Sequence, residues 1–454
     1  MARVVVVGAG IAGLSAAWFL REHDVTVVEA TAHVGGKLRT SDVAGMAVDE
    51  GAEQLLVRRP EALALARDVG LGDRVVHPNT SAAAVSSRGR LRPLPPRTLM
   101  GVPSSAASLR GVLAPWEVAR AELDRVLPGG VPEGDTSVAA YVGRRLGRAV
   151  VDRLVEPLLG GVYAGRADAL SLLATMPQLP RVHGSLMRAV GAVVPPPSDA
   201  PVFAALVGGL QQLADVVAAG SGATRVVGRA VRRIERTPSG FRVVHGPTVD
   251  EQVVEGDAVV VAVPAAPASR LLSDLTPRAA AALGEIDSTS VAIVTVALPA
   301  TQAPALRGSG YLVPAIEGRA VKAVTFSSVK WPHVATSGAV VLRASIGRYG
   351  DVTDLQRDDD ELVRLVLDEL RTTVGVSAAP VATRVTRWGG GLPQYTVGHL
   401  DRVARIRAAV GAVPGLAVCG AAYDGIGVPA CIASARRAAD DVQAVLAERV
   451  NRPQ

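Results

Sequence analysis

Three glycines and one glutamate within residues 8–29 carry the clearest chemical signal in this sequence. Residues 4–13 read VVVVGAGIAG, which places Gly8, Gly10 and Gly13 in a Gly-x-Gly-x-x-Gly pattern. The first glycine of such a pattern allows a tight turn, the second lets the backbone approach a pyrophosphate, and the third lets a helix pack closely on a strand. Glu29 can accept hydrogen bonds from a ribose diol, and its charge disfavours a 2′-phosphate. An ordinary turn needs neither three glycines nor the acid, so the segment predicts dinucleotide binding.

A second glycine loop bears on whether the dinucleotide is a nicotinamide or a flavin. Gly35 and Gly36 are followed by Lys37 and Arg39, whose charges can reach a phosphate or a flavin edge. A nicotinamide enzyme has no use for this second close approach of backbone. The loop and the turn in DEGAEQLL (49–56) resemble the flavoprotein amine-oxidase superfamily, in which these segments lie along FAD. The sequence therefore predicts a resident FAD.

A βαβ unit is needed to position these residues. Residues 3–7 and 25–28 are typical of buried strands, and residues 11–21 of a helix whose N-terminus faces the phosphates. Further on, the pattern predicts a helix entered through glycines in 205–218, a β-meander in 224–246, and a strand and helix in 257–272. It also predicts strands at 290–298, 320–329 and 338–348, a helix at 358–374, and a strand, glycine loop and long helix at the C-terminal end. Residues 90–96 read as a proline loop, and a helical insert follows them up to the prolines near 195. The predicted class is α/β with a helical insert.

Composition narrows the class of protein. The chain has 454 residues and is 49% hydrophobic, enough for two or three globular domains. No apolar run approaches the roughly 20 residues of a spanning helix, and glycines interrupt the apolar N-terminal segment, which argues against a signal peptide. We therefore expect a cytoplasmic protein with membrane contact that is at most peripheral.

The charged residues and cysteines exclude several other functions. The net charge is +6, but only three basic residues are lysines, the arginines are scattered, and aromatic residues make up 3%, which argues against nucleic-acid binding. A basic protein can instead attract an anionic substrate. Cys419 and Cys431 have neither metal-ligand spacing nor the number needed for a disulfide framework, so we expect no metal site.

Six further segments narrow the resemblance to one family. They occur in this order: LLGGVYAGRADALSL (158–172), VFAALVGGLQQLADVV (202–217), TFSSVKWPH (325–333), VLRASIGRYGD (341–351), RWGGGLPQYTVGHL (387–400) and CGAAYDGIGVPACI (419–432). Together they resemble the oxygen-dependent porphyrinogen oxidases of haem synthesis. The resemblance implies a Rossmann-like FAD-binding domain of the p-hydroxybenzoate-hydroxylase type (1–60, 203–266 and 405–454), an α+β substrate-binding domain (61–92 and 267–404) and a helical lobe (93–202).

The resemblance also implies the reaction. Members of this family oxidise a porphyrinogen to a porphyrin with FAD and molecular oxygen, removing six electrons in three rounds and forming hydrogen peroxide. The arginine-rich, lysine-poor composition resembles an actinobacterial protein, and such members typically act on coproporphyrinogen III. Protoporphyrinogen IX is the alternative substrate. An amine oxidase, a carotene desaturase or a non-catalytic FAD-containing porphyrin-binding partner are alternative functions, and transient contact with the next haem-pathway enzyme is compatible with catalysis.

Candidate FAD contacts follow from the glycine motifs and from the family positions that this sequence matches. Lys37 replaces the arginine that is common there in the wider superfamily, and Ala435 stands where many members have glycine. The candidates are Gly8, Ala9, Gly10, Ile11, Ala12, Gly13, Glu29, Ala30, Gly36, Lys37, Arg39, Gly51, Ala52, Glu53, Gln54, Val231, Trp388, Ile426, Gly427 and Val428.

The substrate candidates are fewer. The hypothesis is that a meso carbon of the porphyrinogen loses a hydride to flavin N5, in an apolar slot that holds the macrocycle and needs no metal or paired carboxylates. Gly161 matches a family position whose main-chain carbonyl faces the macrocycle; the alternative is a glycine required by a turn. Arg58 and Arg59 are candidates for the propionates or a solvated pair, and Tyr163 packs on the macrocycle or in the core. Lys330 is interpreted as structural.

Overall fold

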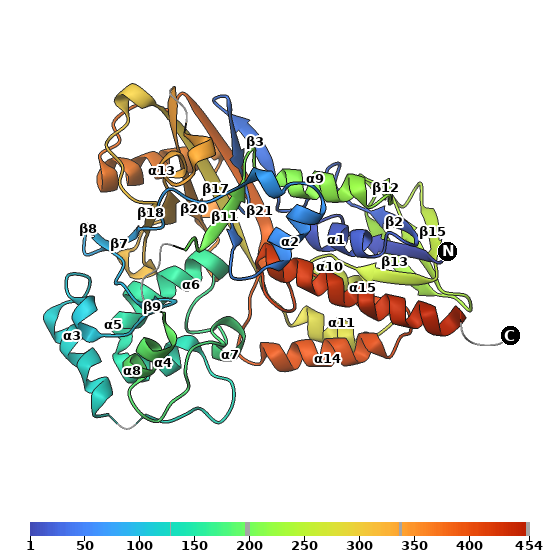
Figure 1. The fold of residues 1–454 in the computed structure, drawn as a ribbon, viewed down its shortest axis with the longest axis horizontal. Helices are drawn as coiled ribbons and strands as arrows, with labels where there is room; N and C mark the ends of the chain where they lie inside the picture. The colour runs from blue at the N-terminus through green and yellow to red at the C-terminus, as the bar shows by residue number, and fades with distance from the viewer. Residues whose placement is uncertain (128, 196–199, 336–337, 451–454) are drawn as a thin grey trace.

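A parallel sheet assembled from distant parts of the chain forms one half of the molecule. The computed structural model describes residues 1–127, 129–195, 200–335 and 338–450 (Figure 1). The five strands are all parallel and lie in the order β12-β2-β1-β16-β22. Their bounds are Arg3–Val7 (β1), Asp24–Val28 (β2), Thr224–Val226 (β12), Ala258–Val261 (β16) and Leu416–Val418 (β22). This confirms the predicted α/β class.

Both faces of this sheet are buried, which explains its unbroken runs of valine. Val4 and Val6 of β1 pack into a core cluster on one face, and Val5 and Val7 into a second cluster on the other face, because successive side chains of a strand alternate. The first face is covered by α1 (Ile11–Phe19), α2 (Glu61–Asp68), α9 (Gln211–Gly220) and α15 (Val428–Val450), and the second by α10 (Ala265–Leu271), α11 (Pro277–Gly284), α14 (His399–Gly411) and the antiparallel strands β13 (Val231–Arg236), β14 (Phe241–His245) and β15 (Gln252–Gly256).

A seven-stranded sheet forms the second layer of the molecule. Its order is β21-β17-β20-β19-β18-β7-β8, and all neighbours are antiparallel except β18 and β7. The strands span Ser288–Pro299 (β17), Ala339–Ile346 (β20), Ala382–Pro393 (β21), Val321–Thr325 (β19), Gly310–Leu312 (β18), Ala83–Ser87 (β7) and Arg90–Pro93 (β8). Helix α13 (Asp359–Val374) packs Leu362, Val366 and Leu370 against one face, at the spacing of an amphipathic helix, and starts at a capping box formed by Asp358 and Glu361.

Two sequence expectations in this sheet are wrong. Residues 90–93 form an edge strand and not a loop; a proline is tolerated at such an edge because one side of the strand has no partner. The strand expected at 320–329 ends at Thr325, and a short helix α12 (Ser327–Lys330) follows it.

A helical lobe packs beside the seven-stranded sheet (Figure 1). Its elements surround a single apolar cluster that also includes Tyr163 and Tyr395. A π-helical segment, Val151–Val155, leads directly into α6, whose second residue is Pro157; a proline removes a backbone donor and disturbs the regular ladder at this point. The helices are α3 (Pro115–Glu122), α4 (Val138–Leu146), α5 (Arg148–Val150), α6 (Glu156–Tyr163), α7 (Leu172–Thr175) and α8 (Leu186–Val193).

Short strand pairs connect these parts of the chain. They are β3 (Thr40–Val43) with β4 (Met46–Asp49), β11 (Phe203–Leu206) with β5 (Leu55–Leu56) and β6 (Val75–Val76), and β9 (Thr98–Leu99) with β10 (Val102–Pro103). Among the described residues, no helix is long and apolar enough to cross a membrane. Helices α10, α11 and α14 pack on the parallel sheet. The boundaries predicted for the FAD-binding domain, the substrate-binding domain and the helical lobe stay predictions.

Candidate cofactor and substrate site

The first glycine loop has the geometry that a bound pyrophosphate requires. Gly8 has φ +102°, and a Cβ there would lie 2.9 Å from the carbonyl oxygen of Ala262. A Cβ on Gly13 would lie only 1.9 Å from the carbonyl oxygen of Gly8, so the helix and the turn touch. Gly10 faces open space, and as the N-cap of α1 it leaves the first N–H groups of that helix without a side-chain cap. Uncapped N–H groups beside bare backbone form an anion-binding surface.

Glu29 lies at the end of β2, beside this loop. Its carboxylate accepts hydrogen bonds from the backbone N–H of Ala9 at 2.7 Å and from the N–H and hydroxyl of Thr31 at 2.8 Å. The backbone of Arg229 donates to the carbonyl oxygen of Glu29, which brings the loop before β13 and half-buried Val231 to the same edge of the sheet. Glu29 and exposed Ala30 thus lie near the loop that leads to Val231, and their contact with an adenosine stays a prediction.

The second glycine loop packs directly on the first. The backbone N–H of Gly35 donates to the carbonyl oxygen of Ala9, and Gly35 forms a β-bridge with Gly10. A Cβ on Gly36 would lie 3.1 Å from the Cα of Gly10, and Gly36 has φ +58°. Only glycines allow two backbone segments to approach this closely, so the two motifs form one surface.

Lys37 contributes a positive charge to this surface. Its ammonium forms no hydrogen bond or ion pair with any described residue, and burial lowers the pKa of Lys37. A Cβ on Gly51 would lie 2.0 Å from the carbonyl oxygen of Lys37 and 3.3 Å from the Trp388 ring, and a Cβ on Gly391 would lie 3.6 Å from Lys37 Cε. A half-buried ammonium without an acceptor is costly, so the position fits an anionic or electron-rich ligand edge.

The turn at residues 51–54 is held by a buried ion-pair network. Glu53 pairs with Lys330 at 2.6 Å and with Arg343, and Gln54 accepts a second hydrogen bond from Lys330 at 2.7 Å. Burial by itself would raise the pKa of Glu53, but the charges of Lys330 and Arg343 lower it to about 2. The Glu53 side chain therefore points to the seven-stranded sheet, and the Lys330 ammonium is occupied by this network.

A neighbouring buried carboxylate fixes β21 to the same turn. Glu50 accepts from Thr386 at 2.8 Å and pairs with Arg384 and, at 3.6 Å, with Arg39. The indole N–H of Trp388 donates to the carbonyl oxygen of Glu50 at 2.9 Å. Arg39, predicted to reach a phosphate or flavin edge, thus lies against Glu50 with about half of its side chain exposed.

The loop before α15 completes the cofactor surface. Gly425 donates to the hydroxyl of Tyr395 at 2.8 Å, and the same hydroxyl donates to the carbonyl oxygen of Ala421 at 2.6 Å. Ile426 packs against the core of the helical lobe, and Gly427 directly precedes α15, which begins at Val428 and runs beside α1 (Figure 1). Cys431, one turn into α15, lies close enough to Lys37 for their charges to interact.

The predicted substrate residues fall into different environments. Arg58 is exposed and has no described partner, whereas Arg59 pairs with Glu61 at 3.0 Å. Gly161 is exposed on α6, and a Cβ there would meet only the Leu312 side chain, at 3.5 Å. Tyr163 is 8% exposed and lies 5.6 Å from the Tyr395 ring, and burial raises its pKa to about 12. Tyr163 is therefore a core residue of the lobe.

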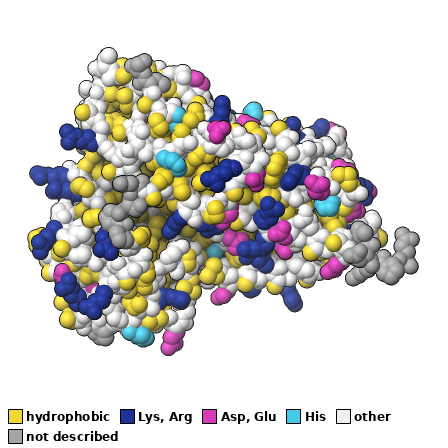
Figure 2. All heavy atoms as spheres, in the orientation of Figure 1, with side chains coloured by type: hydrophobic (Ala, Val, Ile, Leu, Met, Phe, Trp, Pro, Cys, Tyr) yellow, Lys and Arg dark blue, Asp and Glu magenta, His cyan; other side chains and the backbone are white. Residues whose placement is uncertain are grey.

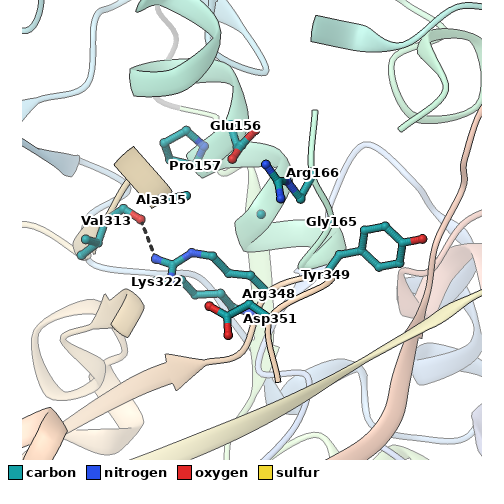
Figure 3. A pocket seen from close by; sticks show the side chains of 11 residues that line it. Glu156, Pro157, Gly165, Arg166, Val313, Ala315, Lys322, Arg348, Tyr349 and Asp351 are labelled. Carbon is teal, nitrogen blue, oxygen red and sulfur yellow. Dashed lines mark hydrogen bonds between the residues drawn. The ribbon is translucent and has the colours of Figure 1, made fainter. Parts of the chain in front are cut away.

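The surface view shows where a large apolar ligand could enter. Figure 2 shows a recess, lined largely by hydrophobic side chains, between the lobe and the rest of the molecule. A separate cavity of about 150 Å³ lies between α6 and the seven-stranded sheet, lined by charged residues that include Glu156, Lys322 and Arg348 (Figure 3).

Four charged residues of the site and of the separate cavity were not predicted from the sequence. Glu50, Arg343, Lys322 and Arg348 were not predicted, although Arg343 and Lys322 stand in otherwise apolar strands, which is a signal that a charged side chain has a special partner. Within the described residues, no group of three or more potential ligands could hold a metal ion.

Comparisons with known proteins agree with this geometry. A family model described as flavin containing amine oxidoreductase matches residues 11–443. The chain is 41% identical over 462 residues to a coproporphyrinogen III oxidase of Mycobacterium tuberculosis, covering 98% of both chains, and 33% identical to that of Bacillus subtilis, covering 96% of this chain and 97% of the relative. A crystal structure from Exiguobacterium, assigned provisionally as a protoporphyrinogen oxidase, superposes with a TM-score of 0.88 at 30% identity and covers 98% of this chain and 99% of its own.

Proposed function

The chain belongs to the family of flavin-containing amine oxidoreductases and uses FAD, and from this premise we propose that it oxidises coproporphyrinogen III to coproporphyrin III with molecular oxygen. The observation that carries the proposal is the similarity to coproporphyrinogen III oxidases over nearly the whole of both chains. The overall reaction removes six electrons and six hydrogens from the porphyrinogen and converts three molecules of oxygen to three of hydrogen peroxide.

The residues of the two glycine loops and of the turn at 51–54 suit this cofactor. When bound, FAD supplies a two-electron acceptor that oxygen can reoxidise. The first N–H groups of α1 would bind the pyrophosphate and Glu29 the ribose, while Lys37 would place its positive charge at the flavin ring, whose other neighbours would be Gly51, Trp388 and the Ile426–Val428 turn. The backbone of Ala52 and Gln54 would border the ring, held by the Glu53 network.

The protein's part in the chemistry is to position the macrocycle and exclude water. Removal of hydrogen extends conjugation in the product, so a strong protein base is not needed, and an apolar slot against the ring suffices. Gly161 leaves one face of α6 without a side chain, and we assign to it a main-chain contact with the macrocycle. Exposed Arg58 is free to bind a propionate, whereas Arg59 must first release Glu61.

The proposal also covers the cellular location of the protein and one partner enzyme. A cytoplasmic location accords with the finding that no helix among the described residues is long and apolar enough to cross a membrane. A reactive, light-absorbing porphyrin product would favour direct transfer to the enzyme that inserts the metal, so we also propose a transient contact with that enzyme.

The test is porphyrin fluorescence in air with purified holoenzyme. Coproporphyrinogen III and protoporphyrinogen IX are supplied in parallel, with no-enzyme controls. Both substrates are needed because the similar Exiguobacterium structure is provisionally assigned as a protoporphyrinogen oxidase. We expect faster porphyrin formation from coproporphyrinogen III. A preference for protoporphyrinogen IX would overturn the substrate, and no acceleration with either would overturn the reaction and reopen the amine, carotene and non-catalytic alternatives.

A further inference from the structure

The charged cavity between α6 and the seven-stranded sheet contains two cations, Lys322 and Arg348, that form no ion pair with a carboxylate of any described residue. Lys322 is 7% exposed, and its ammonium donates to one acceptor, the carbonyl oxygen of Gly347, at 2.9 Å. The Arg348 guanidinium donates only to backbone carbonyl oxygens, those of Val313, Arg319, Ala320 and Val321. Among the described residues, neither side chain has a carboxylate within ion-pair distance. An ammonium has three donors, so Lys322 retains capacity for a further acceptor.

The remaining walls leave the cavity with an excess of positive charge. Glu156 and Arg166 approach from the side of α6, and Arg348 and Asp351 from the opposite wall (Figure 3). Burial raises the pKa of Glu156, and Tyr349 is turned aside to donate to Asp287 at 2.6 Å. Below about pH 7, where Lys322 is charged, three cations therefore face two carboxyl groups, of which Glu156 is the more easily protonated. Such a cavity attracts an anion.

The size of the cavity limits what the anion can be. About 150 Å³ is enough for a carboxylate on a short chain but is well below the 300–1,000 Å³ of a pocket for a whole organic ligand. Gly160 and Gly165 line it without side chains, so backbone forms part of its wall. The occupant must therefore be a small group, and its larger parent would lie outside.

The cavity lies at the same end of the seven-stranded sheet as the flavin surface. Trp388 of β21 pairs with Val291 of β17, Ala292 pairs with Ile346 of β20, and Ile346 pairs with Val321 of β19, next to Lys322. Three strand spacings of about 4.8 Å separate Trp388 from the Lys322 strand, about 14 Å in all. This is comparable to the reach of a tetrapyrrole and its side chains.

Helix α6 joins the cavity to the predicted macrocycle position. Gly160 lines the cavity, and the next residue, exposed Gly161, lies beside Leu312. A macrocycle lying along the exposed side of Gly161 would therefore have one edge next to the mouth of the cavity.

We propose that this cavity binds one propionate arm of the porphyrinogen, with Lys322 and Arg348 as the groups that receive the carboxylate. The inference rests on the proposed function, since it concerns the same substrate. It makes the cavity a positioning site: an arm anchored there would fix the rotation of the macrocycle above the flavin, so that a defined meso carbon faces the ring.

Binding of coproporphyrin III, the oxidised product, tests the proposal without turnover. Holoenzyme is compared with Lys322→Met, Lys322→Arg and the control Arg307→Ala, which changes an exposed arginine without a described partner in the loop before β18. The ligands are coproporphyrin III and its tetramethyl ester, which has the same ring without carboxylates. We expect Lys322→Met to weaken binding of the acid about 10-fold and to leave the ester unchanged, as for one lost charge-assisted hydrogen bond. Lys322→Arg should retain most of the affinity.

Folding and flavin content keep the result interpretable. Since Lys322 is a buried cation without an ion pair, Lys322→Met should leave the Tm of the holoenzyme unchanged or raise it. Equal weakening of acid and ester, an unchanged affinity for the acid, no binding by the parent enzyme, or loss of FAD by the variant would overturn the proposal. Inorganic phosphate is a second probe of the cavity. If phosphate raises the Tm of the parent enzyme but not of Lys322→Met, and both proteins bind coproporphyrin III equally well, the cavity binds a free anion and the proposal fails. Failure of the oxidase assay with intact acid-selective binding would overturn the reaction alone.

Discussion

Unpaired buried cations are the most informative individual residues of this molecule. Lys37 is half-buried and Lys322 is buried, and neither has a carboxylate partner in the part of the chain that the structure describes. Burial lowers the pKa of both, that of Lys322 to about 7. A protein keeps such groups at a cost in stability, since removing the charge would relieve the desolvation penalty. We therefore expect each of them to mark a place where a ligand supplies the missing negative charge.

Replacing Lys37 should separate cofactor affinity from stability. In Lys37→Met we expect the Kd for FAD to rise by roughly tenfold, because one charge-assisted hydrogen bond to the cofactor is lost. The apoprotein should unfold at the same temperature or a higher one. Titration of apoprotein with FAD and calorimetry of the apo form check the two parts, with Lys37→Arg as the charge-retaining control. A lower apoprotein Tm would show that Lys37 is mainly structural.

The pKa of Lys322 gives two pH effects of opposite sign. The lysine is neutral in the free protein above about pH 7 but charged in the unfolded chain up to its ordinary pKa of 10.5, so its burial costs stability below pH 7 and this cost disappears as pH rises through that range. Binding of a carboxylate needs the charged form, so affinity for coproporphyrin III should fall by up to tenfold per pH unit above 7. Stability and affinity measured from pH 6 to 9 check this, and Lys322→Met should flatten both curves.

Gly161 can be tested by adding one methyl group. The nearest atom to a Cβ at this position is a flexible Leu312 methyl at ordinary contact distance, and alanine favours a helix over glycine by about 1 kcal/mol. Gly161→Ala should therefore keep or increase the Tm, but it should raise KM for the porphyrinogen if the macrocycle lies on this face. A lower Tm with unchanged KM would show that the glycine serves only the turn that follows.

At the scale of elements, the turn at 51–54 depends on residues contributed by two distant strands and a short helix. Glu53, Lys330 and Arg343 are all largely buried, so each partner would be left unpaired if another were removed. Breaking a buried pair from one side typically costs about 3–5 kcal/mol. The turn that we propose to border the flavin therefore depends on this network for its stability.

Glu53→Gln should release this turn and with it the cofactor. We expect a Tm loss corresponding to several kcal/mol and weaker FAD retention through gel filtration, whereas the control Glu61→Gln, which breaks only the half-exposed Arg59 pair, should cost less than about 1 kcal/mol. Since the folded pKa of Glu53 is about 2, below its ordinary 4.5, its contribution is complete above pH 4.5 and is lost as pH falls towards 2. The variant should accordingly lose less stability than the parent between pH 4.5 and 2.

The division between what could and could not be predicted from sequence follows the range of the interactions. Gly8, Gly10, Gly13 and Glu29 act within one βαβ unit, so their spacing alone carries the prediction. The Glu53 network joins residues 277 and 290 positions apart, and the Lys322 cavity depends on a helix and three strand ends, neither of which a local pattern can show. Edge strand β8 was missed because its prolines and arginines read as a loop when its partner β7 is not known.

In the whole molecule, the predicted cofactor surface lies at the junction of the two sheets. The glycine loops belong to the parallel sheet, whereas Trp388 lies on a strand of the seven-stranded sheet and Ile426 packs on the helical lobe. One bound FAD would thus contact all three parts of the structure. Its binding energy is then shared by elements that otherwise meet only through packing.

Removal of FAD should therefore destabilise the molecule cooperatively. A ligand at 1,000 times its Kd stabilises the folded state by about 4 kcal/mol, which predicts a Tm several degrees higher for the holoenzyme than for the apoprotein. Calorimetry should show a single holoenzyme transition that moves as one when FAD is withdrawn. Two transitions, of which only one responds to FAD, would show that the seven-stranded sheet is not coupled to the cofactor.

The order in which the chain is synthesised has a consequence for how the flavin is acquired. Both glycine loops leave the ribosome well before β22, which completes the parallel sheet, and before the Ile426–Val428 turn, which is predicted to contact the flavin; both come more than 350 residues after the second loop. At about 5–20 residues per second, on the order of 20 to 75 seconds pass between the two. The parallel sheet stays incomplete during this time, so we expect flavin to be captured late in biogenesis and a shortage of the vitamin to affect newly made chains first.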